Sequence, residues 1–325
     1  MAFENVTTPA MASSQLYRRA IPSAARISEW RALDGWKHRR FDWPAEGRER
    51  GRLLFQAGRG DIFEKYLEVF AHWHALGWSI TSFDWRGQGG SGRLGDDIHV
   101  GHVESFALYI ADFRAFWAEW SAGATAARVA IGHSMGGHLL LRAVVEGGAE
   151  PDAMVLVAPM LGLRSPVGEL MGERVARLCV GVGNPKRPAW RGNVIPATTE
   201  TRQALLTHDM DRYQDEIFWQ TANPELAIGP PSWRWLTEAF ASTRALQRDP
   251  RLGSVRTPVL MLVAEADRLV SPRAALRVAA KLPGAKVIRF GREASHELLR
   301  EVDAVRDVAL GEIDRFLDMH VGARP

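Results

Sequence analysis

The sequence is poor in cysteine, in long apolar runs and in net charge. Cys179 is the one cysteine among 325 residues, so no disulfide can form within the chain, as suits a reducing compartment. The longest apolar runs, near residues 153–163 and 259–264, are far shorter than the ~20 residues that a membrane-spanning helix needs. The net charge of +3 is small and the basic residues are scattered, which excludes nucleic acid as the expected partner.

Several short motifs are also missing. Residues 1–5 contain no basic segment leading into an apolar one, so no signal peptide is evident and we expect a cytoplasmic protein that is able to contact the inner membrane peripherally. The His72/His74 and His99/His102 pairs have no cysteine or carboxylate cluster to complete them, so no metal site is expected. The glycines of residues 87–92 have the wrong spacing for a dinucleotide fingerprint, and predict a structural turn instead.

What the chain does contain is an alternation of short apolar runs with helical patterns. This alternation predicts an α/β fold with a mostly parallel central sheet and helices on both faces. Residues 36–43 are more polar and are predicted to form an antiparallel edge strand. The runs expected as buried strands are 51–56, 78–83, 128–131, 153–157, 259–263 and 286–290.

The alternation stops between residues 160 and 250, where prolines and tryptophans are frequent. We therefore predict a loosely ordered lead-in over residues 1–25, a core of residues 26–159 and 251–325, and a helical cap of residues 160–250. Open α/β sheets bind ligands beyond the carboxyl ends of their strands, so a cap at that edge would wall the substrate pocket.

The most informative stretch is Gly132-His133-Ser134-Met135-Gly136, which lies between a predicted strand and a predicted helix. A Gly-x-Ser-x-Gly in that context is the nucleophile-elbow pattern, in which a tight turn presents the serine hydroxyl. Ser134 is the predicted nucleophile.

A serine needs a base, and the base needs an acid to orient it. Asp267 follows the apolar run 259–263, and His296 follows the last predicted strand, so the chain order is serine, acid, histidine. Glu265 is the local rival of Asp267, but we expect it still to lie within the strand. The backbone N–H groups of Met135 and Arg59 are predicted to form the oxyanion hole, with Gly58 as the next candidate. This chemistry requires no metal or organic cofactor.

The aromatic residues of the cap have two interpretations. Some of them could line an acyl channel, or all could form the cap's own core. The residues predicted to line the pocket are Trp219, Trp233, Trp235 and Phe218. The segment 170–182, with Arg174 and Arg177, could form an amphipathic helix that touches a membrane, or simply a solvated face of the cap.

The chain resembles the α/β-hydrolases of the lysophospholipase L2 and monoacylglycerol lipase group. The matching stretches run in family order over about residues 50–300. They are Gly58-Arg59 with Glu64-Lys65-Tyr66, residues 84–93, Gly132–Gly137, Gly229–Trp233, Ala264–Val270 and Ser295-His296-Glu297. The resemblance implies a serine ester hydrolase of lipid-like substrates with a helical cap. Monoacylglycerol lipases carry a histidine where this chain has Ala57, so the oxyanion segment looks more like that of the bacterial lysophospholipases.

The expected function is therefore hydrolysis of lipid-like carboxylic esters, in first place lysophospholipids, through an acyl-enzyme on Ser134. A monoacylglycerol lipase, a thioesterase or a lactonase would use the same residues. A non-catalytic ligand-binding protein on the same fold is the alternative of another class. The expected partner is a small-molecule or lipid ester, and the sequence predicts no oligomeric state.

Overall fold

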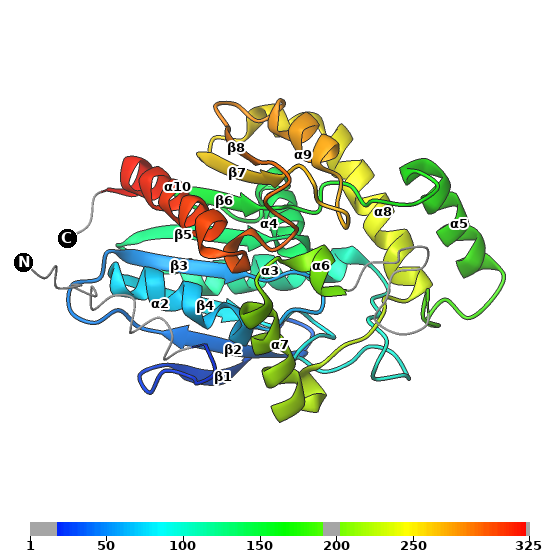
Figure 1. Ribbon diagram of the computed structural model, residues 1–325, viewed down its shortest axis with the longest axis horizontal. Coiled ribbons are helices and arrows are strands. Elements are labelled where there is room, and N and C mark those ends of the chain that lie inside the picture. Colours follow the sequence, from blue (N-terminus) through cyan, green and yellow to red (C-terminus); the bar gives the residue numbers. More distant parts are fainter. Residues whose placement is uncertain (1–17, 191–201, 323–325) are drawn as a thin grey trace, which may run out of the picture.

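An eight-stranded sheet forms the centre of the computed structural model, which describes residues 18–190 and 202–322 (Figure 1). The strands lie in the order β1-β2-β4-β3-β5-β6-β7-β8. The β1–β2 and β2–β4 pairs are antiparallel, and all the other pairs are parallel. The strands are β1 (Arg26–Arg31), β2 (Lys37–Trp43), β3 (Gly51–Gln56), β4 (Trp78–Phe83), β5 (Ala127–His133), β6 (Ala153–Val157), β7 (Val259–Ala264) and β8 (Lys286–Phe290).

The parallel part of the sheet confirms the predicted α/β fold, whereas its antiparallel end differs from the prediction. The six runs predicted as buried strands are all strands, but 286–290 was wrongly predicted as buried, because β8 lies at the edge of the sheet and only Phe290 in it is buried. Residues 37–43 pair antiparallel as expected, but they are not the edge, because β1 lies outside them. β1 gives little apolar signal, since Trp30 is its one buried side chain. A strand exposed in this way has no hydrophobic pattern from which it could be predicted.

Helices cover both faces of the sheet, and neighbouring residues of one strand serve opposite faces (Figure 1). In β6, Val155 and Val157 join one apolar core, while Met154 and Leu156 join the other. Helices α2 (Leu67–Ala75) and α10 (Asp303–Val321) pack on the first face, after the short 3-10 turns η1 (Phe63–Tyr66) and η4 (Leu298–Arg300). The second face carries α3 (Phe106–Ser121), α4 (Met135–Val145) and α9 (Pro272–Ala279).

The chain between β6 and β7 is helical in its described part, and we use the name cap for residues 160–250, of which 191–201 lie outside the described residues. Its elements are α5 (Glu169–Gly181), α6 (Arg202–Leu206), α7 (Met210–Ala222), η2 (Pro224–Leu226) and α8 (Trp233–Arg248), with η3 starting at Pro250 (Pro250–Ser254). No helix in the described part of the chain is long and apolar enough to cross a membrane.

The described end of the N-terminal segment is attached to the cap. Arg18 and Arg19 both form ion pairs with Asp215 of α7, at 2.5 and 2.7 Å. The indole N–H of Trp219 donates to the carbonyl oxygen of Arg18 over 3.0 Å. Residues 18–19 are therefore held in place, while residues 1–17 of the predicted loose lead-in lie outside the described residues.

Candidate active site

Ser134 lies in the sharp turn between β5 and α4, with a positive φ of 51°. A non-glycine residue in that region of φ is strained, and such strain is concentrated at functional sites. The turn is held by the N–H of Ser134, which donates to Val157 over 3.0 Å, and by its carbonyl, which accepts from Met160 over 2.9 Å. The hydroxyl is thereby presented beyond the carboxyl ends of the parallel strands.

The glycines around Ser134 are required by close backbone contacts. A Cβ at Gly132 would lie 2.7 Å from the Cα of Gly137. A Cβ at Gly136 would lie 2.2 Å from the carbonyl oxygen of Gln56, at the end of β3. A side chain at Gly132 would push the end of β5 away from the start of α4, and one at Gly136 would push α4 away from the end of β3.

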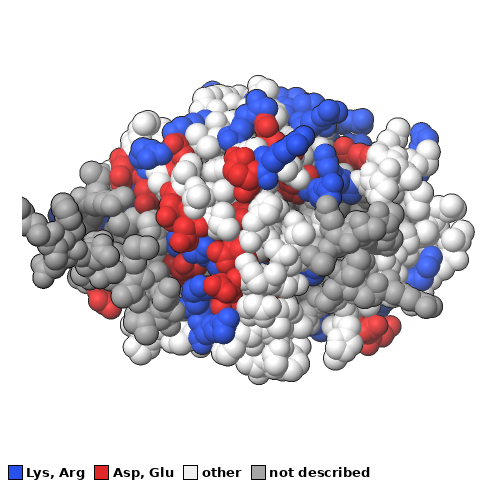
Figure 2. Space-filling view, in the orientation of Figure 1, with Lys and Arg blue, Asp and Glu red and all other residues white. Residues whose placement is uncertain are grey.

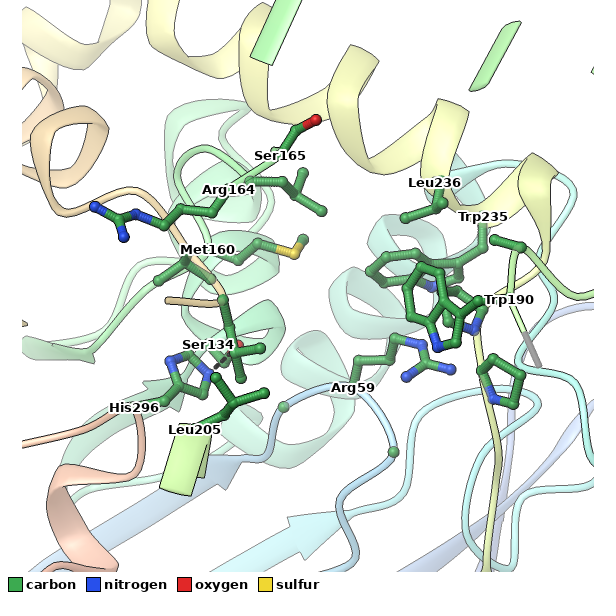
Figure 3. Close-up of a pocket in the computed structure, with 18 of the residues that line it drawn as sticks. Arg59, Ser134, Met160, Arg164, Ser165, Trp190, Leu205, Trp235, Leu236 and His296 are labelled. Carbon is green, nitrogen blue, oxygen red and sulfur yellow. Dashed lines mark hydrogen bonds between the residues drawn. The ribbon is translucent and has the colours of Figure 1, made fainter. Parts of the chain in front are cut away.

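The structure brings Ser134, His296 and Asp267 into one hydrogen-bonded series (Figure 3). Ser134 Oγ lies 2.9 Å from His296 Nε2, and His296 Nδ1 lies 2.5 Å from Asp267 Oδ2. The other carboxylate oxygen of Asp267 accepts from the backbone N–H groups of Leu269 and Val270, at 2.8 and 3.0 Å. This is the geometry in which a histidine can take the proton of a serine hydroxyl.

The environment of His296 favours its protonated form. Burial opposes the imidazolium, but the carboxylate of Asp267, with smaller contributions from Glu297 and Asp61, raises the pKa of His296 above its ordinary value. A raised pKa makes this imidazole a stronger base than a free histidine.

Glu265, the rival acid, points elsewhere. It lies just past the end of β7 rather than within the strand, and its side chain pairs with Arg289 at the surface. Asp267 is the acid that contacts the histidine.

The loop after β3 supplies backbone N–H groups beside Ser134. A Cβ built on Gly58 would lie 3.2 Å from Ser134 Cβ, so this loop passes directly over the serine. The N–H of Gly58 donates to Asp61 Oδ2 over 3.1 Å, and the N–H of Gly60 donates to Gln88 Oε1 over 2.5 Å. The backbone N–H groups of Gly58 and Gly60 are thus already used in hydrogen bonds to side chains. This favours the N–H of Arg59 over that of Gly58 as the oxyanion donor of this loop.

Residues 84–93 support that loop, a role which the sequence analysis missed. The predicted local turn is present, with the N–H of Gly90 donating to Asp84 Oδ2 over 2.8 Å. In addition, Gln88 holds Gly60, and the indole N–H of Trp85 donates to the carbonyl oxygen of Ala57 over 2.9 Å. The turn therefore fixes the loop after β3 at two points.

A cavity of about 370 Å³ lies above Ser134 and His296. Its walls come from the loop after β3, from the segment after β6 and from the cap. The apolar side chains lining it include Met160, Leu163, Val175, Leu205, Leu206, Ile228, Leu236, Phe240, Leu269 and Val270. A cavity with this lining suits an acyl chain.

Two of the four predicted pocket aromatics line the cavity and two do not. Trp233 and Trp235 lie in its wall, together with Trp190. Trp219 packs instead in the apolar core on the α2 side of the sheet, and Phe218 is partly exposed beneath the guanidinium of Arg19. Both lie on α7, whose buried face points toward α2 rather than toward Ser134, an orientation that helical spacing alone does not reveal.

A buried cluster of charged residues adjoins the triad. Lys65 Nζ forms ion pairs with Asp61, with Glu216 of α7 at 2.9 Å and with Glu297 at 2.8 Å. Asp61 also accepts from the Tyr66 hydroxyl over 2.9 Å. Burial opposes charge on Glu297, yet Lys65 and Arg300 lower its pKa to about 2.

This cluster links the cap to the loop that carries His296, because Glu216 belongs to α7 and Glu297 follows His296 directly. The stretches Glu64-Lys65-Tyr66 and Ser295-His296-Glu297 were noted in the sequence as part of a family resemblance, without a role for the lysine or the glutamate. The one available signal was a charged residue within each of these stretches. Lys65 and Glu297 are 232 residues apart in the chain, so no local sequence pattern indicates that they pair.

A family model and several known proteins match most of this chain. The family model described as serine aminopeptidase, S33, matches residues 47–303. Lysophospholipase L2 of Escherichia coli K12 is 32% identical over 277 residues, which cover 81% of this chain and 79% of that protein. A probable lysophospholipase L2 of Haemophilus influenzae is 24% identical over 279 residues, which cover 84% of this chain and 86% of that protein.

Solved structures share the fold at low sequence identity. A soluble variant of monoglyceride lipase from Saccharomyces cerevisiae, in complex with a substrate analog, superimposes with a TM-score of 0.75 at 17% identity, over 93% of this chain and 97% of that one. A carboxyl esterase from Bacillus coagulans superimposes with a TM-score of 0.70 at 14% identity, over 92% of this chain and all (100%) of that one. At these identities the likeness establishes a common fold.

Proposed function

The chain belongs to the α/β-hydrolase family of lysophospholipase L2 and is a carboxylic ester hydrolase, and from this premise we propose that it is a lysophospholipase acting through Ser134, His296 and Asp267. The observation that carries the proposal is the hydrogen-bonded series of these three residues at the floor of a largely apolar cavity. The cavity fits the acyl chain of a lipid ester, and the serine lies where the ester carbonyl would be reached.

The proposed reaction has two halves. His296 takes the hydroxyl proton as Ser134 Oγ attacks the ester carbonyl, while Asp267 holds the imidazole and stabilises its positive charge. The backbone N–H groups of Met135 and Arg59 stabilise the negative oxygen of the tetrahedral intermediate. His296 then protonates the leaving alcohol, and water releases the acyl group from Ser134 by the same steps in the same order.

A lipid-facing role is proposed for α5. Its inner side packs against α8, where Glu173 pairs with Arg244 over 2.6 Å and Ala176 is buried. Its outer side carries apolar residues of which Leu170 is 58% and Leu178 is 64% exposed. In the space-filling view the surface over α5 is mainly uncharged, with isolated basic side chains (Figure 2).

The position of α5 suits delivery of a lipid to the active site. Val167, just before the helix, and Val175 on it belong to the lining of the catalytic cavity. Exposed apolar side chains with flanking arginines are typical of helices that lie in a membrane interface. We propose that α5 contacts the lipid surface from which the substrate enters.

Other acyl substrates are the alternatives at the same site. Monoacylglycerols, acyl-CoA thioesters and lactones would be attacked by the same groups, and pocket shape decides among them. A non-catalytic binding protein would not turn over any of them.

The test is side-by-side hydrolysis of lysophospholipids, monoacylglycerols and acyl-CoAs of equal acyl length, with Ser134→Ala as the control. The proposal expects the highest kcat/KM for lysophospholipids and no turnover by the alanine variant. A higher kcat/KM for the acyl-CoA thioester would mean that the protein is a thioesterase rather than a lysophospholipase. Hydrolysis at the wild-type rate by Ser134→Ala would overturn the mechanism.

A further inference from the structure

The side chain of Arg59 lies in the wall of the catalytic cavity, across from His296. It extends along the wall beside Trp190 and Trp235 (Figure 3). Its guanidinium carbon lies 5.3 Å from the centre of the Trp235 ring, and its Nη2 donates to the carbonyl oxygen of Gly229. The group is therefore held in one place by the cap, in the wall of the cavity that Ser134 also lines.

This guanidinium has no carboxylate partner in the described structure. Its Nε atom is buried and makes no hydrogen bond. The nearest acid in the sequence, Asp61, is already bound by Lys65 and by the Tyr66 hydroxyl.

Other arginines with little exposure differ from Arg59 in this respect. Arg39 pairs with Glu64 and Asp84, and Arg212 pairs with Glu68, Asp209 and Asp303. A guanidinium shielded from water without an anion is costly, because the Gly229 carbonyl and the Trp235 ring replace only part of its lost hydration.

The residues around Arg59 nevertheless leave room for its guanidinium and let it keep its positive charge. A Cβ at Gly101 would lie 2.8 Å from Nη2 of Arg59, so glycine at that position leaves room for the guanidinium. Burial lowers the pKa of Arg59 to about 10, and Arg202 nearby adds to the fall. The group thus still carries its charge at neutral pH.

We propose that the Arg59 side chain binds the phosphate of a lysophospholipid head group. The inference rests on the proposed function and names the part of the substrate that this wall recognises. A guanidinium fork matches phosphate oxygens with two parallel hydrogen bonds. Nε is buried and Nη2 already donates one hydrogen bond to Gly229, so Nη1, which makes no hydrogen bond in the described structure, and the second N–H of Nη2 supply the donors for that contact.

The position of Arg59 favours phosphate over the other anion that the reaction produces. The carboxylate of a released fatty acid forms from the carbonyl carbon that Ser134 attacks, so it lies at the oxyanion hole. The guanidinium lies farther along the wall, beside Trp190 and Trp235, and we place the leaving group on that side and the acyl chain across the cavity, against Met160 and Leu205 (Figure 3). In a lysophospholipid only a few bonds of glycerol separate the ester from the phosphate, so one residue can serve the oxyanion with its N–H and the phosphate with its side chain.

The experiment compares two substrates with one acyl chain, monodecanoyl-glycerol and its phosphate-bearing counterpart decanoyl lysophosphatidylglycerol, both below their micelle concentrations. We measure kcat/KM for each in wild type, Arg59→Gln and Arg59→Lys. The quantity of interest is the ratio of the two kcat/KM values, because damage to the oxyanion hole lowers both substrates alike. Arg59→Gln is expected to lower the phosphate-to-neutral ratio by about 10- to 100-fold, the effect of a lost charge-assisted pair. Arg59→Lys should restore part of it, since it keeps the charge and loses the fork.

The matched control is Arg164→Gln, which removes the same charge from an exposed arginine on the cavity rim. The side chain of Arg164 points away from the Arg59 wall (Figure 3), and its removal should change the ratio by less than about 3-fold. An unchanged ratio in Arg59→Gln, or an equal change in both variants, overturns the phosphate site. In either case turnover of the neutral ester by wild type and its loss in Ser134→Ala still decide the proposed function separately.

Discussion

Ser134 has a strained backbone, and close contacts around it hold that conformation in place. Its φ of 51° is tolerated because Gly132 and Gly136 let the turn approach α4 and the end of β3 within contact distance. The turn at Ser134 could be predicted from the sequence, because close backbone contacts require glycines at fixed spacing after a strand. The partners of Ser134 could be predicted from the chain order of serine, acid and histidine. The sequence could not predict Lys65 or Glu297 beside the site, because their pairing depends on how distant segments fold together.

The pH dependence of activity follows from the raised pKa of His296. The imidazole must be neutral to accept the serine proton, so kcat/KM should fall as the pH drops through the pKa of His296, which lies above the ordinary 6.5. Replacing Glu297 by Gln removes one of the carboxylates that raise this pKa. We expect the acid limb of the kcat/KM profile to shift to lower pH.

Glu265→Gln is the control for that shift, since Glu265 pairs with Arg289 at the surface. Its profile should match that of wild type. An acid limb that stays in place in Glu297→Gln, or that moves to higher pH, would show that Glu297 does not act on His296 through its charge.

At the scale of elements, α7 is attached to the core through charge as well as apolar contact. Lys65, at the start of the α2 region, pairs with Glu216 of α7 and with Glu297. Replacing Lys65 by Met would leave several buried carboxylates without their cation. We expect this to lower the free energy of unfolding by about 3–5 kcal/mol, measured by urea denaturation.

The exposed Lys286→Met is the matched change, because Lys286 pairs with Glu312 at the surface over 2.8 Å. It should cost no more than about 1 kcal/mol. Equal losses in the two variants would mean that the buried cluster contributes no special stability.

The helix α5 gives the second prediction at this scale. The double variant Leu170→Ser/Leu178→Ser should weaken binding to anionic phospholipid vesicles in a sedimentation assay, because it removes the exposed apolar side chains. Unfolding free energy should change by less than about 0.5 kcal/mol per site, since both residues are exposed.

Val308→Ser/Met319→Ser on α10 changes two exposed apolar residues elsewhere and should leave vesicle binding intact. Vesicle binding that survives in the α5 variant would remove α5 as the membrane contact. The sequence offered 170–182 as an amphipathic helix, and a helix is present over Glu169–Gly181. It did not indicate that the packed face would be the one with Glu173 and Ala176, because that choice depends on the position of α8.

At the scale of the whole molecule, the strands with an apolar run in the sequence were predictable, including the largely exposed β8, and β1 was not. Strands such as β6 are apolar on both faces, and their sequences show it directly. β1 has one buried residue, and therefore only pairing with β2 reveals it. The elbow pattern and the chain order likewise predicted that Ser134, Asp267 and His296 meet, whereas the walls of the cavity depend on how the cap folds over the sheet.

A covalent probe shows whether Ser134 is the nucleophile of an acyl transfer. Wild type and Ser134→Ala are incubated with a fluorophosphonate, and the modified peptide is identified by mass spectrometry. We expect one adduct on Ser134 in wild type and none in Ser134→Ala. If folded wild type forms no adduct, or if Ser134→Ala still forms one, Ser134 is not the nucleophile.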